Sequence, residues 1–206
     1  MEYYIKTDDS YFGKINADIE PLLIECINEA KPHLILNPQL ALFNKLTNQN
    51  VIVGFFSNES IGIRYAKQFV LSNPLSPSLM ELLHLINNEI NCDFNSVIIQ
   101  ELPNETHYYK KESSEDNNKE KKVFISYGTI RRFRIKDKLT IRPVINIPMC
   151  SKEILVMNNK FANDYNYEIP TENAYKEQMY LFTFSCNVYP LSFRSGDESR
   201  FYTKYK

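Results

Sequence analysis

The stretch that decides the fold runs from residue 94 to residue 138. It begins Phe94-Asn95-Ser96-Val97-Ile98-Ile99 and continues as a polar segment from 100 to 122. It ends Val123-Phe124-Ile125-Ser126-Tyr127-Gly128-Thr129-Ile130-Arg131-Arg132-Phe133-Arg134-Ile135-Lys136-Asp137-Lys138. Runs rich in Val, Ile, Phe and Tyr between polar clusters are typical of strands. The sequence therefore predicts a strand, a long loop, a second strand, a turn at Gly128 and a third strand.

The third strand of this stretch alternates in character. Ile130, Arg132, Arg134 and Lys136 fall on one side, and Arg131, Phe133 and Ile135 fall on the other. This pattern indicates a strand with one basic face, which Ile130 and Arg131 each interrupt. Guanidinium groups suit phosphate geometry, so the candidate nucleic-acid contacts are Arg131, Arg132, Arg134 and Lys136. The alternative is that these cations form a solvated strand face or pair with the acidic loop.

The composition is that of an ordinary globular domain. The chain has 206 residues, of which 43% are hydrophobic and 24% are charged, and this length suits one domain with a sizeable core. The formal net charge is -1. The field of the whole protein will not attract phosphate, so any nucleic-acid binding must use a local basic patch.

The cysteines and the apolar runs bear on the cellular compartment. Cys26, Cys92, Cys150 and Cys186 are scattered without a CxxC pair, which argues against a zinc site and against a disulfide framework. No apolar run has the length of a transmembrane helix, and the N-terminus lacks the features of a signal peptide. We therefore expect a soluble intracellular protein that does not bind membranes. The sequence does not distinguish the cytoplasm from the nucleus.

The first 50 residues are predicted to be mainly helical. Asn16 or Asp18 would cap a helix with Pro21 in its first turn, and Pro32 would end it. A second apolar stretch, from 34 to 46, is interrupted by Pro38.

The next segment combines extended stretches with one helix. Residues 51–56 are typical of a buried strand, and residues 61–70 of a second extended stretch. Ser78 would cap a helix that continues to Ile90, with Glu81 completing a capping box. His84 would lie on the polar side of this helix.

Strands dominate the second half of the chain. After residue 138 we expect strands at 139–142, at 154–157 and at 179–189. Helices followed by strands favour an α+β fold with a sheet sandwich or barrel. We expect a single domain with a helical part (1–50), a β part (51–190) and a polar, aromatic tail (191–206). The mixed charges of residues 110–122 predict a solvated, mobile loop, and neither this loop nor the tail receives a role.

Several of these stretches resemble the AlkB family of iron- and 2-oxoglutarate-dependent dioxygenases. Phe94 to Ile98 resembles the family's FNSVL, and Tyr127 to Lys136 resembles FGA-x-R-x-F-x-x-R. Further similar segments, in the family's order, are 61–65, 73–82, 153–157 and 180–184. The resemblance covers roughly residues 50–187. It implies a double-stranded β-helix, or jelly roll, with the N-terminal helices packed on one side.

The resemblance also implies ligand positions, and this chain departs from the family at each of them. The iron motif H-x-D falls on Glu112 and Ser114, and Tyr167 stands where the second histidine is expected. The positions that contact 2-oxoglutarate fall on Gln100, Leu102, Met179 and Ser185. The three histidines are His33, His84 and His107, and none lies C-terminal of residue 107. Without imidazoles and arginines at these places, neither Fe(II) nor the 2-oxoglutarate carboxylate has its usual partners, so we expect neither cofactor.

Three hypotheses on function follow. The first is a catalytically inactive AlkB-like protein, a pseudoenzyme that binds DNA or RNA or serves as a scaffold. In that case the tyrosines available to stack on bases are Tyr108, Tyr109, Tyr165 and Tyr167. The second is a protein–protein interaction module without a nucleic-acid role. The third is an active dioxygenase that demethylates nucleic-acid bases with Fe(II) and 2-oxoglutarate.

Overall fold

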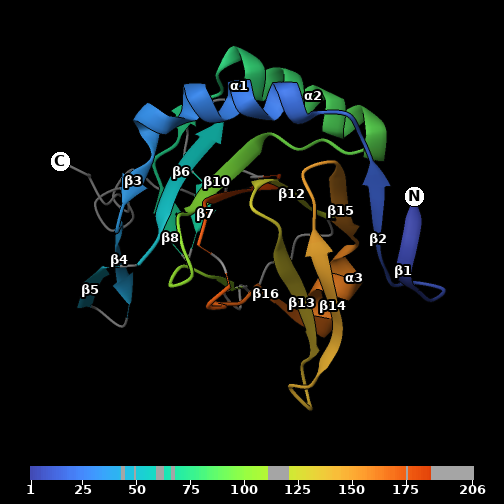
Figure 1. Ribbon diagram of the computed structural model, residues 1–206. Coiled ribbons are helices and arrows are strands. Elements are labelled where there is room, and N and C mark those ends of the chain that lie inside the picture. The colour runs from blue at the N-terminus through green and yellow to red at the C-terminus, as the bar shows by residue number, and fades with distance from the viewer. Residues whose placement is uncertain are drawn as a thin grey trace, which may run out of the picture.

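Two antiparallel sheets face each other, and two helices cover the outer face of the larger sheet (Figure 1). The structure is a computed structural model. It describes residues 1–42, 45–48, 50–58, 63–65, 68–110, 121–174 and 176–186. The layers are therefore helices, large sheet and small sheet, and each junction between layers holds an apolar core.

The large sheet contains nine strands. In spatial order they are β1 (Glu2–Lys6), β2 (Tyr11–Asn16), β15 (Glu153–Met157), β12 (Lys122–Gly128), β17 (Met179–Ser185), β10 (Ser96–Leu102), β6 (Ile52–Ser57) and β3 (Ile35–Leu36), while β9 (Asn73–Pro74) pairs with β6. All pairs except β6–β9 are antiparallel. The central strands β12, β17 and β10 come from the second half of the chain and bring residues 96–102 beside residues 179–185.

The small sheet contains four strands in the order β11 (Tyr109–Lys110), β16 (Tyr165–Ile169), β13 (Arg131–Asp137) and β14 (Pro143–Met149). Two hairpins form separate two-stranded sheets: β4 (Gln39–Leu42) with β5 (Lys45–Asn48), and β7 (Ile63–Tyr65) with β8 (Gln68–Val70), of which β7 and β8 pack against β6. The helices are α1 (Glu20–Ala30), α2 (Pro77–Ile90) and α3 (Asn159–Asp164), with a 3-10 turn, η1, at Lys31–His33.

The alternating side chains of the central strands separate two cores. Val97 of β10 and Phe182 of β17 point to the helical side, where they join Leu23 of α1 and Leu82 of α2. Leu181, the neighbour of Phe182 on β17, points to the other side of the sheet. There Leu181 joins the inward side chains of the small sheet, so one strand serves both cores.

The sequence prediction for the β-rich half is confirmed in its main lines. Strands lie at 52–57, 96–102, 122–128, 131–137, 153–157 and 179–185, as expected. A mostly antiparallel β structure with few helices also agrees with the predicted α+β class and with a jelly-roll arrangement. The turn at Gly128 is present, and its φ of 103° lies in a region that L side chains rarely adopt.

The prediction that residues 1–50 are mainly helical is wrong. Residues 2–6 and 11–16 form β1 and β2, and β2 extends the large sheet by pairing with β15. The apolar stretch that follows contributes the short strands Ile35–Leu36, Gln39–Leu42 and Lys45–Asn48. Long-range strand pairing decided these segments, so local patterns could not predict them. One helix of the covering layer, α1, comes from this part of the chain, and the other, α2, comes from residues 77–90.

Both predicted helix caps are also displaced. α1 begins after Ile19 without a side-chain cap, although Pro21 does lie in its first turn. Ser76 caps α2 instead of Ser78, because its hydroxyl oxygen accepts from the Leu79 N–H at 3.4 Å and Pro77 occupies the first helical position. The proposed capping box with Glu81 is therefore wrong. His84 is exposed on α2, as predicted.

Residues 139–142, predicted as a strand, instead form the turn between β13 and β14. The strand lies just after them, at Pro143–Met149. The sequence analysis also missed α3 and β16. Most of the charged loop (111–120) and the tail (191–206) lie outside the described residues.

Candidate functional site

Tyr167 marks the interior position that the AlkB resemblance assigns to the second iron-binding histidine. The side chain is 4% exposed. Its ring stacks on Phe133 with centroids 6.0 Å apart and meets Phe124 edge-on at 5.3 Å. Tyr109 stacks on it at 6.3 Å. This position is therefore part of an aromatic core between the two sheets.

The four positions assigned to 2-oxoglutarate lie on two neighbouring strands. Gln100 and Leu102 belong to β10, and Met179 and Ser185 belong to β17, the strand that pairs with it. Leu102 and Met179 are fully buried in the core between the sheets. The Ser185 hydroxyl lies 3.0 Å from that of Ser96, and Ser96 also donates to the Ser185 carbonyl oxygen at 2.7 Å. None of the four side chains carries the positive charge that a carboxylate would need.

Glu112 and Ser114, the positions assigned to the H-x-D motif, lie outside the described residues. The three histidines lie on different elements, with His33 in η1, His84 on α2 and His107 in the turn after β10. Burial, together with the charge of Arg131, lowers the pKa of His107. Among the described residues, no three His, Cys, Asp or Glu side chains gather in a group that could hold a metal ion. The described side chains at the assigned positions therefore do not fit Fe(II) and 2-oxoglutarate.

Hydroxyl groups also lie near the assigned positions, and of these the sequence analysis singled out only Ser185. Ser57, Ser96 and Ser185 lie side by side across β6, β10 and β17. The hydroxyl of Thr183, two residues before Ser185, is buried and has no hydrogen-bond partner among the described residues. Single serines and threonines inside apolar strands are common, so no local signal marks Ser57, Ser96 or Thr183.

Arg131, one of the four candidate phosphate contacts, is fully buried. Its Nη2 atom donates to the carbonyl oxygens of Leu102 at 2.7 Å, Asn104 at 3.0 Å and Glu177 at 3.2 Å, and its Nη1 atom donates to that of His107 at 3.1 Å. The side chain thus holds the turn after β10 against the chain that leads into β17. In this arrangement Arg131 is not available to a phosphate, which corrects its assignment.

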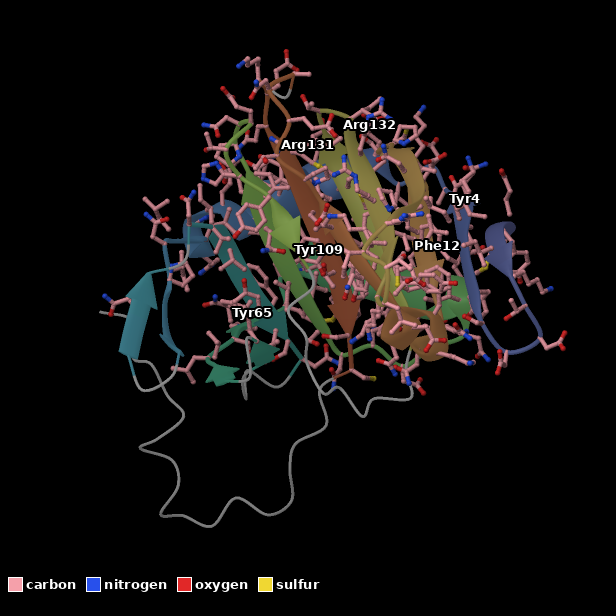
Figure 2. The ribbon with its side chains drawn as sticks, turned by 90° about the horizontal axis from the view of Figure 1, so that it is seen from below. Tyr4, Phe12, Tyr65, Tyr109, Arg131 and Arg132 are labelled. Carbon is pink, nitrogen blue, oxygen red and sulfur yellow. The ribbon has the colours of Figure 1, made fainter. Side chains whose placement is uncertain are left out.

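The other three candidates form a basic face on the outer side of the small sheet, and we use this name for Arg132, Arg134 and Lys136. Figure 2, viewed from the side opposite the helices, shows Arg131 and Arg132 at adjacent positions. The two side chains point to opposite faces of β13, so one is buried and the other exposed. The predicted alternation of this strand is thus confirmed.

Two glutamates accompany the basic face. Glu168 of β16, directly opposite Arg134 in register, lies 2.6 Å from Lys136 and 3.3 Å from Arg134. Glu172 lies 3.4 Å from Arg134 and 3.8 Å from Arg132. Most of the acidic loop lies outside the described residues, and the described pairs come from the segment after α3. Among the described residues, the ion pairs of this face join three cations to two carboxylates.

The four tyrosines proposed to stack on bases differ in exposure. Tyr167 and Tyr109 belong to the aromatic cluster described above, and Tyr165 stacks on Phe161 with centroids 4.3 Å apart. Tyr108 is 49% exposed. Of the four, Tyr108 is the one whose ring is most open to a ligand from solvent.

Comparison with known proteins agrees with this architecture. The fold is similar to that of a solved AlkB homologue. The structure described as "The structure of OsALKBH1" superposes with a TM-score of 0.53 and covers 90% of this chain and 100% of that chain, at 8% sequence identity. No family model and no curated protein matches the sequence. The likeness is therefore one of fold, and it supports the AlkB-like jelly roll that the sequence segments implied.

Within the part of the chain that the structure describes, no helix has both the length and the apolar character that a membrane crossing requires.

Proposed function

We propose that this chain is a non-catalytic AlkB-like protein that binds nucleic acid through the basic face of its small sheet. The observation that carries the proposal is the packing of Tyr167. The position that would hold an iron-binding imidazole is filled by a buried phenol between Phe133 and Phe124. A side chain held by aromatic neighbours on several sides contributes to folding, and moving it aside for a metal would cost core packing.

The apolar replacements support the same conclusion. A bound 2-oxoglutarate carboxylate needs charged or strongly polar donors, and burying it without them is costly. Leu102 and Met179 instead add to the core between the sheets. At these two positions the side chains contribute to core packing and offer no donor to a carboxylate.

Support for nucleic-acid binding comes from the outer face of the small sheet. Arg132 is 52% exposed, and Arg134 and Lys136 lie at alternate positions of the same strand. Exposed ion pairs are weak and are screened by salt, so a polyanion can compete with Glu168 and Glu172 for these cations. A row of cations along a strand fits the repeated charges of a phosphate backbone.

The test is a binding titration with fluorescently labelled duplex and single-stranded oligonucleotides, followed by anisotropy at several salt concentrations. We expect affinity to fall as salt rises. Substituting Arg132→Ala and Arg134→Ala together should lower the slope of log affinity against log salt by about two. The double variant Glu168→Gln with Glu172→Gln should raise affinity, since it removes the competing carboxylates.

The matched control is Lys31→Ala, which removes an exposed cation from η1, beyond α1 in the helical layer. It should leave affinity unchanged if binding uses the basic face. Absence of binding at low salt would refute the nucleic-acid role. An equal loss of affinity in the control and in the arginine variants would refute the assignment to this face.

A further inference from the structure

The turn between β13 and β14 exposes an unusual amount of apolar surface. Leu139 is 94% exposed, Ile141 57% and Val144 47%. Figure 1 shows this hairpin extending past the other elements on the side opposite α1 and α2. Single exposed apolar residues are common, but three within six residues at the end of a protruding hairpin indicate a contact surface.

The Asp137 carboxylate closes the turn by accepting hydrogen bonds from it. One of its carboxylate oxygens accepts from the N–H groups of Leu139 at 3.0 Å and Thr140 at 2.7 Å, and from the Thr140 hydroxyl at 2.9 Å. The backbone of Asp137 bonds Ile141 and Arg142 at 2.9 Å and 3.0 Å. The hydrogen bonds from the Thr140 N–H and hydroxyl lower the pKa of Asp137. These hydrogen bonds define the turn that carries the exposed apolar side chains.

Ile141 adopts a backbone conformation that is costly for its residue type. Its φ is 59°, in the left-handed region where glycine and asparagine are the usual residues. A β-branched residue there costs on the order of 1–3 kcal/mol. A glycine would relieve this cost but would remove the apolar side chain from the tip. The retained strain suggests that the side chain itself is used.

Cations flank the apolar tip. Arg142 is exposed, and its backbone N–H donates to the Thr140 hydroxyl at 3.4 Å. Lys138, on the other side of the turn, donates from its ammonium group to the carbonyl oxygen of Asn163. Lys136, two residues before Lys138, is the member of the basic face nearest to the turn. The apolar tip and the basic face are thus continuous along one hairpin.

We propose that this tip is a wedge that enters a nucleic-acid duplex, with Leu139 inserted between adjacent base pairs and Arg142 against the neighbouring phosphates. The proposal rests on the proposed nucleic-acid role and specifies duplex as the ligand. Proteins that unstack a base step frequently insert an apolar wedge such as Leu or Ile and also contact the DNA through Arg or Lys, and this turn carries both kinds of residue.

The geometry favours a duplex over a lipid surface. Membrane-binding segments present a broad apolar face, commonly with Trp or Phe, to a plane of lipid. Here two side chains form a narrow tip, and the cations form a line that continues up β13 away from it. A line of cations behind a narrow wedge matches a rod-like polyanion that is entered at one point.

The experiment uses the full chain and a duplex that carries 2-aminopurine at its centre, whose fluorescence rises when the base is unstacked. The unmodified protein should bind and raise this fluorescence. Leu139→Ser should abolish the rise and weaken duplex binding about tenfold, equivalent to about 1.4 kcal/mol. Its affinity for the matching single strand should stay unchanged. The control is Leu36→Ser, which alters a 66% exposed leucine of β3 and should behave like the unmodified protein.

The possible outcomes distinguish insertion of the wedge from nucleic-acid binding by the basic face. The wedge would be overturned if the protein binds duplex without raising the fluorescence and if both leucine variants bind duplex equally well. Binding by the basic face would then remain intact. Absence of binding to any oligonucleotide at low salt would overturn both. Binding to phosphatidylserine vesicles that Leu139→Ser abolishes, with no binding to duplex, would show that the tip is a lipid anchor and overturn the wedge.

Discussion

Phe133 and Tyr167 stack from neighbouring strands of the small sheet, with ring centroids 6.0 Å apart and planes inclined by 23°. Phe133 lies on β13 and Tyr167 on β16, and both rings point toward the large sheet. The place where the AlkB resemblance expects a metal ligand is thus a junction of two strands and two sheets. Its chemistry is that of a hydrophobic core.

The first prediction concerns the stability that Tyr167 supplies. Tyr167→Ala should lower the free energy of unfolding by about 3–5 kcal/mol, because it removes a buried aromatic ring from a close-packed cluster. Urea denaturation followed by circular dichroism measures the change. Tyr108→Ala, at a 49% exposed position, is the control and should change stability by no more than about 0.5 kcal/mol. Similar losses in both variants would contradict the described packing.

A second prediction concerns catalysis. Tyr167→His should not produce iron- and 2-oxoglutarate-dependent succinate formation, because Leu102, Met179 and Ser185 still lack the charge that would hold the co-substrate. The unmodified chain should likewise form no succinate above the rate of the assay without protein. Succinate formation by the unmodified chain, dependent on both Fe(II) and 2-oxoglutarate, would contradict the proposed non-catalytic role.

The third prediction compares two adjacent arginines. Arg131→Met should lower the free energy of unfolding by about 3–5 kcal/mol, because buried carbonyl oxygens lose the guanidinium that donates to them. Arg132→Met makes the same chemical change one residue later, on the exposed face, and should cost no more than about 0.5 kcal/mol. Denaturant unfolding of both variants decides the point. Equal costs would mean that the two side chains do not occupy opposite faces of β13.

The fourth prediction concerns the turn at Gly128. A Cβ atom at this position would lie 2.4 Å from the carbonyl oxygen of Gln178, and the φ of 103° is unfavourable for any L side chain. Gly128→Ala should therefore destabilise the protein by about 1–3 kcal/mol, although the residue is exposed. Thermal unfolding measures the effect, with Asn146→Ala on exposed β14 as a control that should be nearly neutral. Tolerance of alanine at 128 would contradict the described turn.

The sequence predicted the faces of β13 correctly because alternation is a local property. Phe133 and Ile135 are buried, while Arg132 is exposed, as the period of two requires. Arg131 follows the same rule, and alternation placed it on the inner side with the apolar residues. Its assignment as a phosphate contact relied on residue type alone. Whether an inward arginine finds carbonyl oxygens depends on the turn at 102–107, which is distant in the sequence.

What the sequence did not predict depended on contacts between distant residues. Glu168 and Glu172 pair with the basic face across more than 30 residues, and no local pattern indicates which carboxylate will be opposite Arg134. Residues 11–16 form a strand that pairs with β15, more than 130 residues later, and residues 2–6 pair in turn with residues 11–16. The turn at 137–142 had a local signal that was overlooked, since Asp followed three residues later by Thr is typical of side chains that close a turn.

The last prediction concerns pH and the junction of α1 and α2. The Ser76 hydroxyl, and after it Ser78, hydrogen-bond to the Glu29 carboxylate and lower its pKa. The Ser78 N–H donates to it at 3.2 Å, so an anion from α1 lies at the first turn of α2, where the helix dipole favours negative charge. Because the pKa is lower in the folded state, the stabilisation is complete above the unfolded pKa. It is lost as pH falls through the folded pKa.

Urea midpoints should therefore differ between the unmodified chain and Glu29→Gln at pH 7, and the difference should shrink as the pH falls below about 4. Glu89→Gln, which removes an exposed charge from α2, controls for net charge. A difference for Glu29→Gln that stays constant down to pH 3 would mean that Glu29 does not contribute as a carboxylate bound at the start of α2.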